Sequence, residues 1–211
     1  QGVMGEAKFL GGQLTGAVVK DAMTGAEFPV RAKISINAAG PWAASMVAKL
    51  SPSAQGAPPP MLSRAMNVVT RPLVDSHACG GVAGGRFLFL VPWRNASILG
   101  TGHDTYRDSP DQLKVSRWDL EAFLKDAREA FPHAPLTTNE VRLVHRGLLP
   151  MVGGSGTHVK LLKESRVVDH SRHGLPGLVS VYGVRYTTAR QTAEEAVDAV
   201  FQTLGHATPP P

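Results

Sequence analysis

The fold is decided by the stretch GLVSVYGVRYTTAR at residues 177–190. Its first six residues, 177–182, form an apolar run with the length and composition of a buried strand. Gly183 ends this strand, and a helix is predicted over residues 187–204. A strand, a glycine and a helix in this order are typical of a nucleotide-binding domain.

The same order of elements occurs near the start of the chain. Two short strands are predicted at 14–20 and 27–36, and the turn-forming residues 21–25 between them predict a hairpin. The second strand runs into the sequence NAAGPW at 37–42, which precedes a helical pattern over 43–50. The beginning and the end of the chain therefore resemble each other in organisation.

A mostly antiparallel block lies between these two segments. Its predicted strands are residues 66–70, 86–92, 97–101, 141–146 and 159–162. The glycine-rich segments 79–85 and 153–157 are expected to be loops, and the sequence GTGH at 100–103 is expected to be a turn.

One strong helix is predicted in this block, over residues 116–131. Ser116 is the expected N-cap, Asp119 the expected partner in a capping box, and Pro132 the stop. The apolar side chains recur with helical spacing and should form one core-facing stripe, at Leu120, Phe123, Leu124, Ala127 and Phe131.

Prolines mark the boundaries of the block. The segment 51–60 contains four prolines and cannot continue a helix or a central strand, and Pro176 precedes the last strand. The sequence therefore predicts a first domain over 1–57, a second over 58–176 and a return to the first over 177–211. The fold class is a mixture of α/β and α+β, in which a partial Rossmann-like domain carries an inserted antiparallel-sheet domain.

Composition limits the function classes. The chain has 211 residues, a net charge of +5 and no apolar run of the roughly 20 residues that a membrane-spanning helix needs. The charge favours an anionic partner, such as a phosphate or carboxylate substrate, a dinucleotide or nucleic acid. Because the basic residues are scattered singly, without a basic run or interleaved aromatic side chains, nucleic acid is not expected as a partner.

Metal and nucleotide motifs are missing from the sequence. A single cysteine, Cys79, excludes an internal disulfide and cysteine-based metal clusters, and no two histidines have the spacing of a helical metal site, so no metal is expected. The fingerprint G-x-G-x-x-G, which binds the pyrophosphate of a dinucleotide, does not occur. Because the chain begins at Gln1 without a signal-peptide pattern, we expect this start to be an interior cut with the fingerprint upstream of it.

Three segments in order carry a resemblance over nearly the whole chain: NAAGPW at 37–42, LVPW at 90–93 with LGT at 99–101, and YGVRYTTAR at 182–190. Together they resemble the FAD-dependent glycerol-3-phosphate dehydrogenases of the D-amino-acid-oxidase-like superfamily. The resemblance implies a carboxy-terminal fragment of a flavoenzyme with FAD as cofactor. It implies an activity that oxidises a small anionic alcohol by hydride transfer to the flavin, although the fragment alone is expected to be inactive.

The resemblance also implies the cofactor residues. The family's first segment brings backbone close to the flavin, which places Ala39 and Gly40 there, and its last segment lies against the flavin ring, which places Gly183, Thr187 and Thr188 there. Thr187 or Thr188 is predicted to cap the following helix. The positive end of that helix would then stabilise negative charge on a reduced flavin.

Substrate residues transfer only in part. Arg166 matches an arginine of the family and Arg185 replaces a lysine, so both are expected to bind an anionic substrate group where the two domains meet. Leu149 stands where the family has an arginine, and Asn67 stands where it has a histidine. Asn67 is still a candidate substrate contact, but the two replacements argue against glycerol 3-phosphate as the substrate. No catalytic residue is assigned.

Two other function classes stay open at this point. A binding module that holds an anionic ligand without redox chemistry would also lack the fingerprint, and an upstream G-x-G-x-x-G would exclude it. A nucleic-acid-binding domain would show DNA binding that weakens steeply with salt. The expected location is the cytoplasm, with a peripheral position at the inner membrane as an option, and the oligomeric state is not predicted.

Overall fold

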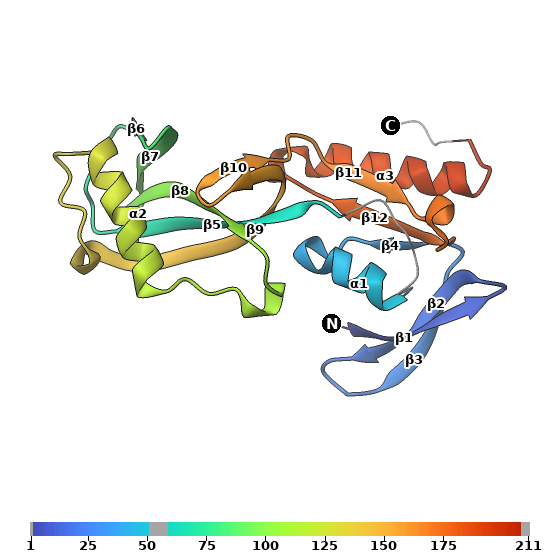
Figure 1. Cartoon of the computed structure of the whole chain (residues 1–211). Helices are drawn as coiled ribbons and strands as arrows, with labels where there is room; N and C mark the ends of the chain where they lie inside the picture. Colours follow the sequence, from blue (N-terminus) through green and yellow to red (C-terminus); the bar gives the residue numbers. More distant parts are fainter. Residues whose placement is uncertain (1, 51–58, 208–211) are drawn as a thin grey trace. The chain divides into compact units, whose positions relative to one another are not determined.

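The computed structural model of the chain describes residues 2–50 and 59–207, and it divides them into two compact units (Figure 1). Unit 1 combines the first 60 residues with those from Leu162 onward, and unit 2 comprises Met61–Leu161. Unit 2 thus lies between the two parts of unit 1 along the chain. The proline-rich boundary falls on residues 51–58, which lie outside the described residues.

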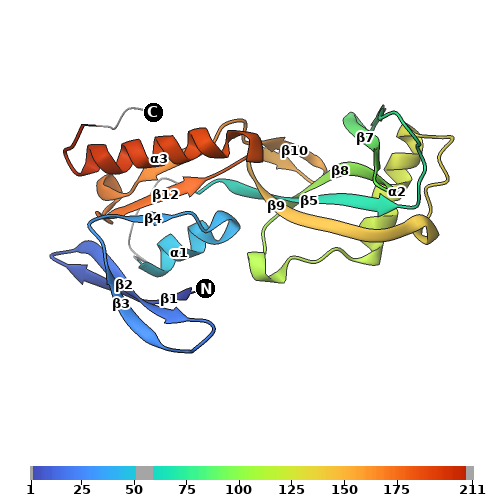
Figure 2. The same ribbon diagram turned by 180° about the vertical axis from the view of Figure 1, so that it is seen from behind.

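Unit 1 contains a three-stranded sheet in the order β11-β12-β4. Its strands are β4 (Ser35–Asn37), β11 (Arg166–Asp169) and β12 (Leu178–Tyr182). β12 pairs in parallel with β4, whereas β11 pairs antiparallel with β12. In Figures 1 and 2, α3 (Ala189–Thr203) runs along one side of this sheet and α1 (Ala43–Leu50) lies on the other. Each parallel strand is followed by a helix, as the sequence predicts.

A second sheet of unit 1 is formed by β1 (Gly2–Leu10), β2 (Gln13–Asp21) and β3 (Glu27–Arg31), paired antiparallel in that order. The hairpin of β2 and β3 confirms the prediction, whereas β1 was not predicted. The single strand predicted over 27–36 is wrong. It breaks after Arg31, because the backbone of Ser35 bonds instead to Gly177 and continues as β4 beside β12.

Unit 2 is built on a six-stranded antiparallel sheet in the order β10-β9-β5-β8-β7-β6. The strands are β5 (Met61–Thr70), β6 (Cys79–Ala83), β7 (Arg86–Trp93), β8 (Ala96–Tyr106), β9 (Val141–Ser155) and β10 (His158–Leu161). α2 (Arg117–Ala130) covers one face of the sheet and buries Phe123, Leu124 and Ala127 against Leu88 and Leu99. Burying one such large apolar side chain stabilises the fold by about 1.5–3 kcal/mol, so this stripe anchors the helix.

Two segments of unit 2 that were predicted to be a loop and a turn are strands, because α2 packs closely against them. The segments 79–85 and 100–103 were expected to be a loop and a turn, but Cys79–Ala83 is strand β6 and residues 100–103 lie within β8. A side chain at Gly81 would come within 2.5 Å of the Ala130 carbonyl oxygen, and one at Gly102 within 2.8 Å of the Phe123 ring. These glycines therefore make room for α2 rather than for a turn.

The chain also returns to unit 1 at a different residue from the one predicted from the sequence. Unit 1 resumes at Leu162, whereas the sequence places the return at residue 177. The reason is β11, whose residues 166–169 pair with 179–182 of β12 in the sheet of unit 1. Arg166 therefore belongs to the same unit as Arg185.

The capping box of α2 is present as predicted. The Ser116 hydroxyl accepts from the Asp119 backbone N–H at 3.1 Å, and the Asp119 carboxylate accepts from the Ser116 N–H at 2.8 Å. We expect Ser116→Ala to lower the free energy of unfolding by about 1 kcal/mol, because the mutation removes one partner of this cap. Urea unfolding measures the change. Thr188→Ala, at a helix start where no side chain caps the backbone, is the control, and an equal loss in both variants would contradict the role of the cap.

Candidate functional site

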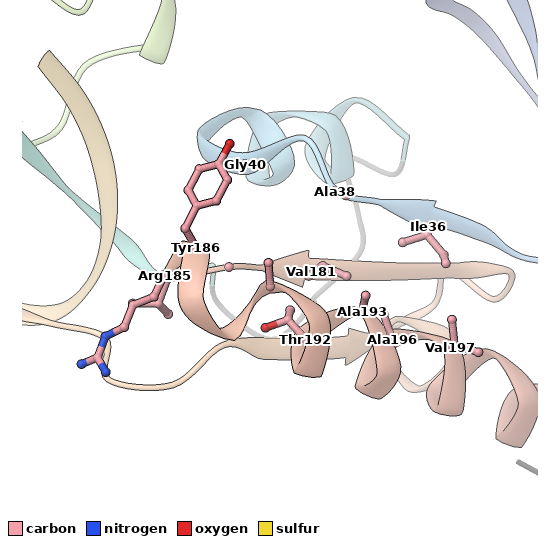
Figure 3. A pocket seen from close by; sticks show the side chains of 13 residues that line it. Ile36, Ala38, Gly40, Val181, Arg185, Tyr186, Thr192, Ala193, Ala196 and Val197 are labelled. Carbon is pink, nitrogen blue, oxygen red and sulfur yellow. The ribbon is translucent and has the colours of Figure 1, made fainter. Parts of the chain in front are cut away.

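An open cavity of about 570 Å³ lies in unit 1, at the ends of two adjacent parallel strands. β4 and β12 pair with Ser180 opposite Asn37, so the segments that leave their carboxyl ends lie side by side. In open α/β sheets this edge is where ligands bind. The lining residues are Ile36, Ala38, Gly40, Val181, Gly183, Val184, Arg185, Tyr186, Ala189, Thr192, Ala193, Ala196 and Val197 (Figure 3).

Two glycines keep the backbone accessible in this cavity. A side chain at Gly40 or Gly183 would meet no atom within 4 Å, so it would project into open space. Gly40 also has a φ of 55°, a left-handed conformation that favours glycine. A flat ligand could therefore approach the main chain at both strand ends.

The remaining wall is mostly apolar and comes from one face of α3. Small side chains at Ala189, Ala193 and Ala196 recur at helical spacing along this face. The Thr192 hydroxyl is satisfied within the protein, since it donates to the Thr188 carbonyl and lies 2.7 Å from the Ser165 hydroxyl. The wall thus presents few polar groups to a ligand.

The start of α3 corrects one prediction. Thr187 and Thr188 belong to a 3₁₀ turn, Tyr186–Thr188, and α3 begins at Ala189. The Thr188 hydroxyl donates to the Arg185 carbonyl at 3.2 Å, so neither threonine caps the helix through its side chain. Thr188 occupies the N-cap position, but the preceding 3₁₀ turn directs its hydroxyl back to the Arg185 carbonyl instead of to the first turn of α3. Neither threonine lines the cavity, and Ala39 does not line it either.

Arg185 and Tyr186 stand at one end of the cavity. Figure 3 shows the Arg185 guanidinium extending away from α3, and the Tyr186 ring on the side of Gly40. Tyr186 is fully exposed. In the part of the chain that the structure describes, Arg185 has no ion pair and its side chain makes no hydrogen bond. Its charge is therefore available to a ligand.

Arg166 lies at the first position of β11, directly opposite Tyr182 of β12. It is half-buried, and none of the residues described in the structure forms an ion pair with it. Burial raises the pKa of Tyr182, an effect that the Ser180 hydroxyl and the charge of Arg166 oppose. Arg166 is not part of the cavity lining.

Asn67, the third predicted substrate residue, belongs to unit 2. Its Oδ1 accepts a hydrogen bond from the Thr101 hydroxyl at 2.9 Å, and a side chain at Gly100 would collide with it. Gly100 and Thr101 therefore fix the orientation of Asn67 on β5. The structure thus brings Gly40, Gly183 and Arg185 together at one cavity, with Arg166 elsewhere in unit 1 and Asn67 in unit 2.

Unit 2 has a smaller cavity of about 190 Å³ between its sheet and α2. Its charged residues are mostly paired: Arg64 binds Asp119 at 2.6 Å and Asp104 at 3.3 Å, and Arg86 binds Asp126. His103 lies beside this cavity with its Nδ1 3.2 Å from the Ser63 hydroxyl. These ion pairs hold α2 to the sheet, so we assign this cavity a structural role.

Two histidines make the stability of the chain depend on pH: His103 is half-buried and His170 is buried. Burial lowers the pKa of His103, and the charge of Arg86 lowers it further. Burial and then the charge of His173 lower the pKa of His170, whereas Asp169 opposes the shift. Since the unfolded histidines titrate near 6.5, the unfolded state binds more protons below that pH, and stability is lost as the pH falls.

We therefore expect the melting temperature to fall between pH 7 and pH 5. Each histidine contributes a slope of at most about 1.4 kcal/mol per pH unit in this window. Thermal unfolding of His170→Gln should show a shallower slope than the unchanged chain. His77→Gln, which replaces an exposed histidine, is the control, and equal slopes in all three proteins would contradict the assignment.

A family comparison matches almost all of the chain: a sequence model described as FAD dependent oxidoreductase (DAO) covers residues 1–207. The chain belongs to this family. The mixed α/β architecture with an antiparallel sheet confirms the predicted fold class. The predicted resemblance to the D-amino-acid-oxidase-like superfamily is confirmed as well.

Comparisons with individual relatives agree with this family assignment. Glycerol-3-phosphate dehydrogenase from Synechocystis sp. is 26% identical over 212 residues, which cover 93% of this chain and 38% of the relative. The human mitochondrial glycerol-3-phosphate dehydrogenase is 28% identical over 197 residues, or 90% of this chain and 26% of that protein. The chain thus spans well under half the length of these relatives.

Solved structures show the same fold. The glycerol-3-phosphate dehydrogenase from Bacillus halodurans, complexed with FAD, superposes with a TM-score of 0.77 at 25% identity, covering 99% of this chain and 40% of that one. L-alpha-glycerophosphate oxidase from Mycoplasma pneumoniae, with FAD bound, gives a TM-score of 0.62 at 17% identity over all of this chain and 52% of that one. No helix in the described ranges of this family member is long and apolar enough to cross a membrane.

Sequence reasoning missed several residues of the cavity in this FAD dependent oxidoreductase chain. Tyr186 was passed over because an isolated tyrosine after a strand carries no motif of its own. The α3 face was also missed, although the spacing of Ala189, Ala193 and Ala196 is a readable signal of one helical face. Side-chain partners such as Ser180 could be found only from the structure, since 143 residues separate it from Asn37.

Proposed function

We propose that this chain is the carboxy-terminal part of an FAD-dependent dehydrogenase that oxidises a small anionic alcohol. The observation that carries this proposal is the cavity at the carboxyl ends of β4 and β12, where Gly40 and Gly183 expose backbone beside Arg185, with which no described residue forms an ion pair. Its volume falls within the roughly 300–1,000 Å³ of ligand sites. The family assignment supplies the redox chemistry.

The cavity fits part of a flavin. A planar ring needs close approach to main chain and apolar contact, and the two glycines and the alanine face of α3 offer both. The N-terminus of α3 carries partial positive charge and has no side-chain cap, so it would favour negative charge on the ring. When bound, FAD supplies the acceptor for the hydride that leaves the substrate carbon.

The proposed substrate contacts are Arg166, Arg185 and Asn67. Arg166 and Arg185 would bind the anionic group, because a guanidinium fork matches the geometry of carboxylate and phosphate. Asn67, held by Thr101, would donate or accept a neutral hydrogen bond. Since Leu149 and Asn67 stand in place of a cation and a titratable group, we propose an anionic alcohol other than glycerol 3-phosphate.

An anaerobic titration of the full-length protein tests this function. The flavin absorbance near 450 nm is followed while glycerol 3-phosphate and small 2-hydroxy acids are added in turn. Bleaching by one 2-hydroxy acid, at lower concentration than by glycerol 3-phosphate, supports the proposal. A preference for glycerol 3-phosphate would overturn the substrate assignment, and the absence of bleaching by every anionic alcohol would overturn the activity.

The isolated 211-residue chain is expected to bind FAD weakly or not at all. The G-x-G-x-x-G fingerprint, whose backbone binds the pyrophosphate, does not occur in its sequence. Fluorescence titration should therefore show no saturable quenching of the flavin at micromolar concentrations. A stoichiometric yellow complex of the isolated chain would contradict this expectation.

We also propose a reducing, cytoplasmic location for the protein, with peripheral contact with the inner membrane as the finer option. The single, exposed Cys79 fits a reducing compartment, since it has no partner for a disulfide within the chain. Fractionation of cells that express the full-length protein tests this location.

A further inference from the structure

A chain of buried polar side chains connects three segments of unit 1 behind the cavity. His170 follows β11, Ser180 lies in β12 and Asn37 ends β4. Their exposed fractions are 1%, 0% and 3%, which is unusual for polar residues. The His170 Nε2 lies 2.8 Å from the Ser180 hydroxyl oxygen, which in turn lies 3.2 Å from the Asn37 amide nitrogen.

The direction of these hydrogen bonds is determined at Asn37. Its Oδ1 accepts from the Ala39 backbone N–H at 3.2 Å, and its Nδ2 donates to the Ala43 carbonyl at 3.0 Å. Nδ2 therefore also donates to the Ser180 hydroxyl oxygen. This hydroxyl still has its proton and a lone pair with which to bond to the His170 Nε2.

Asn37 holds both ends of the turn that forms one wall of the cavity. Ala39 and Ala43 lie on either side of the tight Gly40 turn, and one asparagine side chain bonds to both. Ala38 and Gly40 line the cavity within this segment. Any movement of the Asn37 amide would therefore move the wall.

We infer that His170 and Ser180 are positioning residues, which set the wall at Ala38 and Gly40 through Asn37. This inference extends the proposed function, because the same wall would lie against the flavin. Burying polar side chains costs free energy, which their hydrogen bonds to one another offset only in part, so the position of this chain beside the cavity wall argues for a task there. The His170 Nδ1, which has no partner among the described residues, shows that the histidine is held by its Nε2 contact.

Three other side chains complete the surroundings of this chain. Tyr182 shares the β12 face with Ser180 and interacts with its hydroxyl, and the His173 ring lies 6.2 Å from that of His170. Asp169, the neighbour of His170, accepts from the Ser171 backbone and hydroxyl instead of the imidazole. Among the described residues, the link to Ser180 is thus the only side-chain hydrogen bond of His170, and through Ser180 it reaches Asn37.

Hydrogen–deuterium exchange of the full-length protein tests the inference. Peptides that contain residues 38–43 are compared in the unchanged protein, Ser180→Ala, His170→Leu and His170→Gln. We expect exchange in this segment to rise roughly three- to tenfold in the first two variants, because loss of one hydrogen bond loosens Asn37. His170→Gln, which keeps a side chain that can donate or accept a hydrogen bond, should restore most of the protection.

Ser97→Ala is the matched control, since Ser97 is equally buried and accepts two backbone N–H groups, but lies in unit 2. It should leave residues 38–43 unchanged. Equal exchange in Ser180→Ala and the unchanged protein, or equal effects of Ser97→Ala and Ser180→Ala, would overturn the inference. Exchange is measured on the flavin-free protein, so its outcome does not depend on cofactor binding. Cofactor binding is tested separately, by the absorbance of samples to which FAD has been added.

Discussion

Replacing Arg185 with alanine in the full-length protein is expected to lower kcat/KM by roughly tenfold to a few hundredfold. A hydrogen bond to a charged group contributes about 1.5–3 kcal/mol, and each 1.4 kcal/mol corresponds to a factor of ten. Arg185 is exposed at the end of the cavity, and no described residue pairs with it, so the mutation should cost little stability. Steady-state kinetics on the preferred substrate measure the effect.

Two further variants show whether the guanidinium binds substrate directly. Arg185→Lys should recover only part of the activity if the fork binds in a bidentate way. Arg190→Ala is the control, because Arg190 lies on the same helix start but pairs with Glu194 on the surface. If Arg166→Ala and Arg185→Ala both lower the melting temperature and leave the kinetics unchanged, the two arginines only hold the fold and the substrate binds elsewhere.

Replacing Gly183 with valine should remove most of the bound flavin from the full-length protein. A side chain at this position meets no atom of the chain within 4 Å, and the backbone is not left-handed, so the fold should accept it. The added methyl groups would instead occupy the space proposed for the ring. Overpacking costs about 1–3 kcal/mol, which predicts flavin affinity weaker by roughly five- to a hundredfold.

Gly153→Val provides the matched control for this variant. Gly153 lies in β9 of unit 2, and a side chain there also meets no atom within 4 Å and requires no left-handed backbone. Flavin content is read from the absorbance of each purified protein, and melting temperature reports on folding. Full flavin content in Gly183→Val would place the ring away from the strand ends, whereas equal loss in both variants would indicate a general effect on folding.

The sequence predicts the local elements well where one physical signal dominates. Ser116, Asp119 and the apolar stripe of α2 all specify the same helix, and the structure has it at Arg117–Ala130. The order of strand, glycine and helix at both ends of the chain is likewise readable, although the first strand, β4, is shorter than predicted. The hairpin of β2 and β3 follows from its turn residues in the same way.

Predictions failed where distant residues decide the local structure. Gly81 and Gly102 lie in glycine-rich segments that are typical of loops. They are in fact strand residues, and α2 packs so closely against them that a larger side chain would not fit. Threonine is a residue type that often caps a helix, but the 3₁₀ turn before α3 directs the Thr188 hydroxyl to the Arg185 carbonyl. β11 was assigned to the inserted domain, since nothing in its four residues indicates which sheet they join.

In the candidate site, too, some residues could be predicted from local sequence and others depend on distant contacts. Its glycines and Arg185 follow directly from the segments at 37–42 and 182–190, because those segments end neighbouring parallel strands. The α3 face and the buried link from His170 to Asn37 depend on tertiary contacts, which no single segment specifies. A family resemblance adds expected residue roles, which the variants above test.

The absorbance spectrum of the purified full-length protein tests the central claim most directly. We predict the absorbance bands of an oxidised flavin, and release of about one FAD per chain on denaturation, since the chain belongs to a family of FAD dependent oxidoreductases. A protein that folds cooperatively but stays colourless, and takes up no FAD when the cofactor is supplied in excess, would contradict the account.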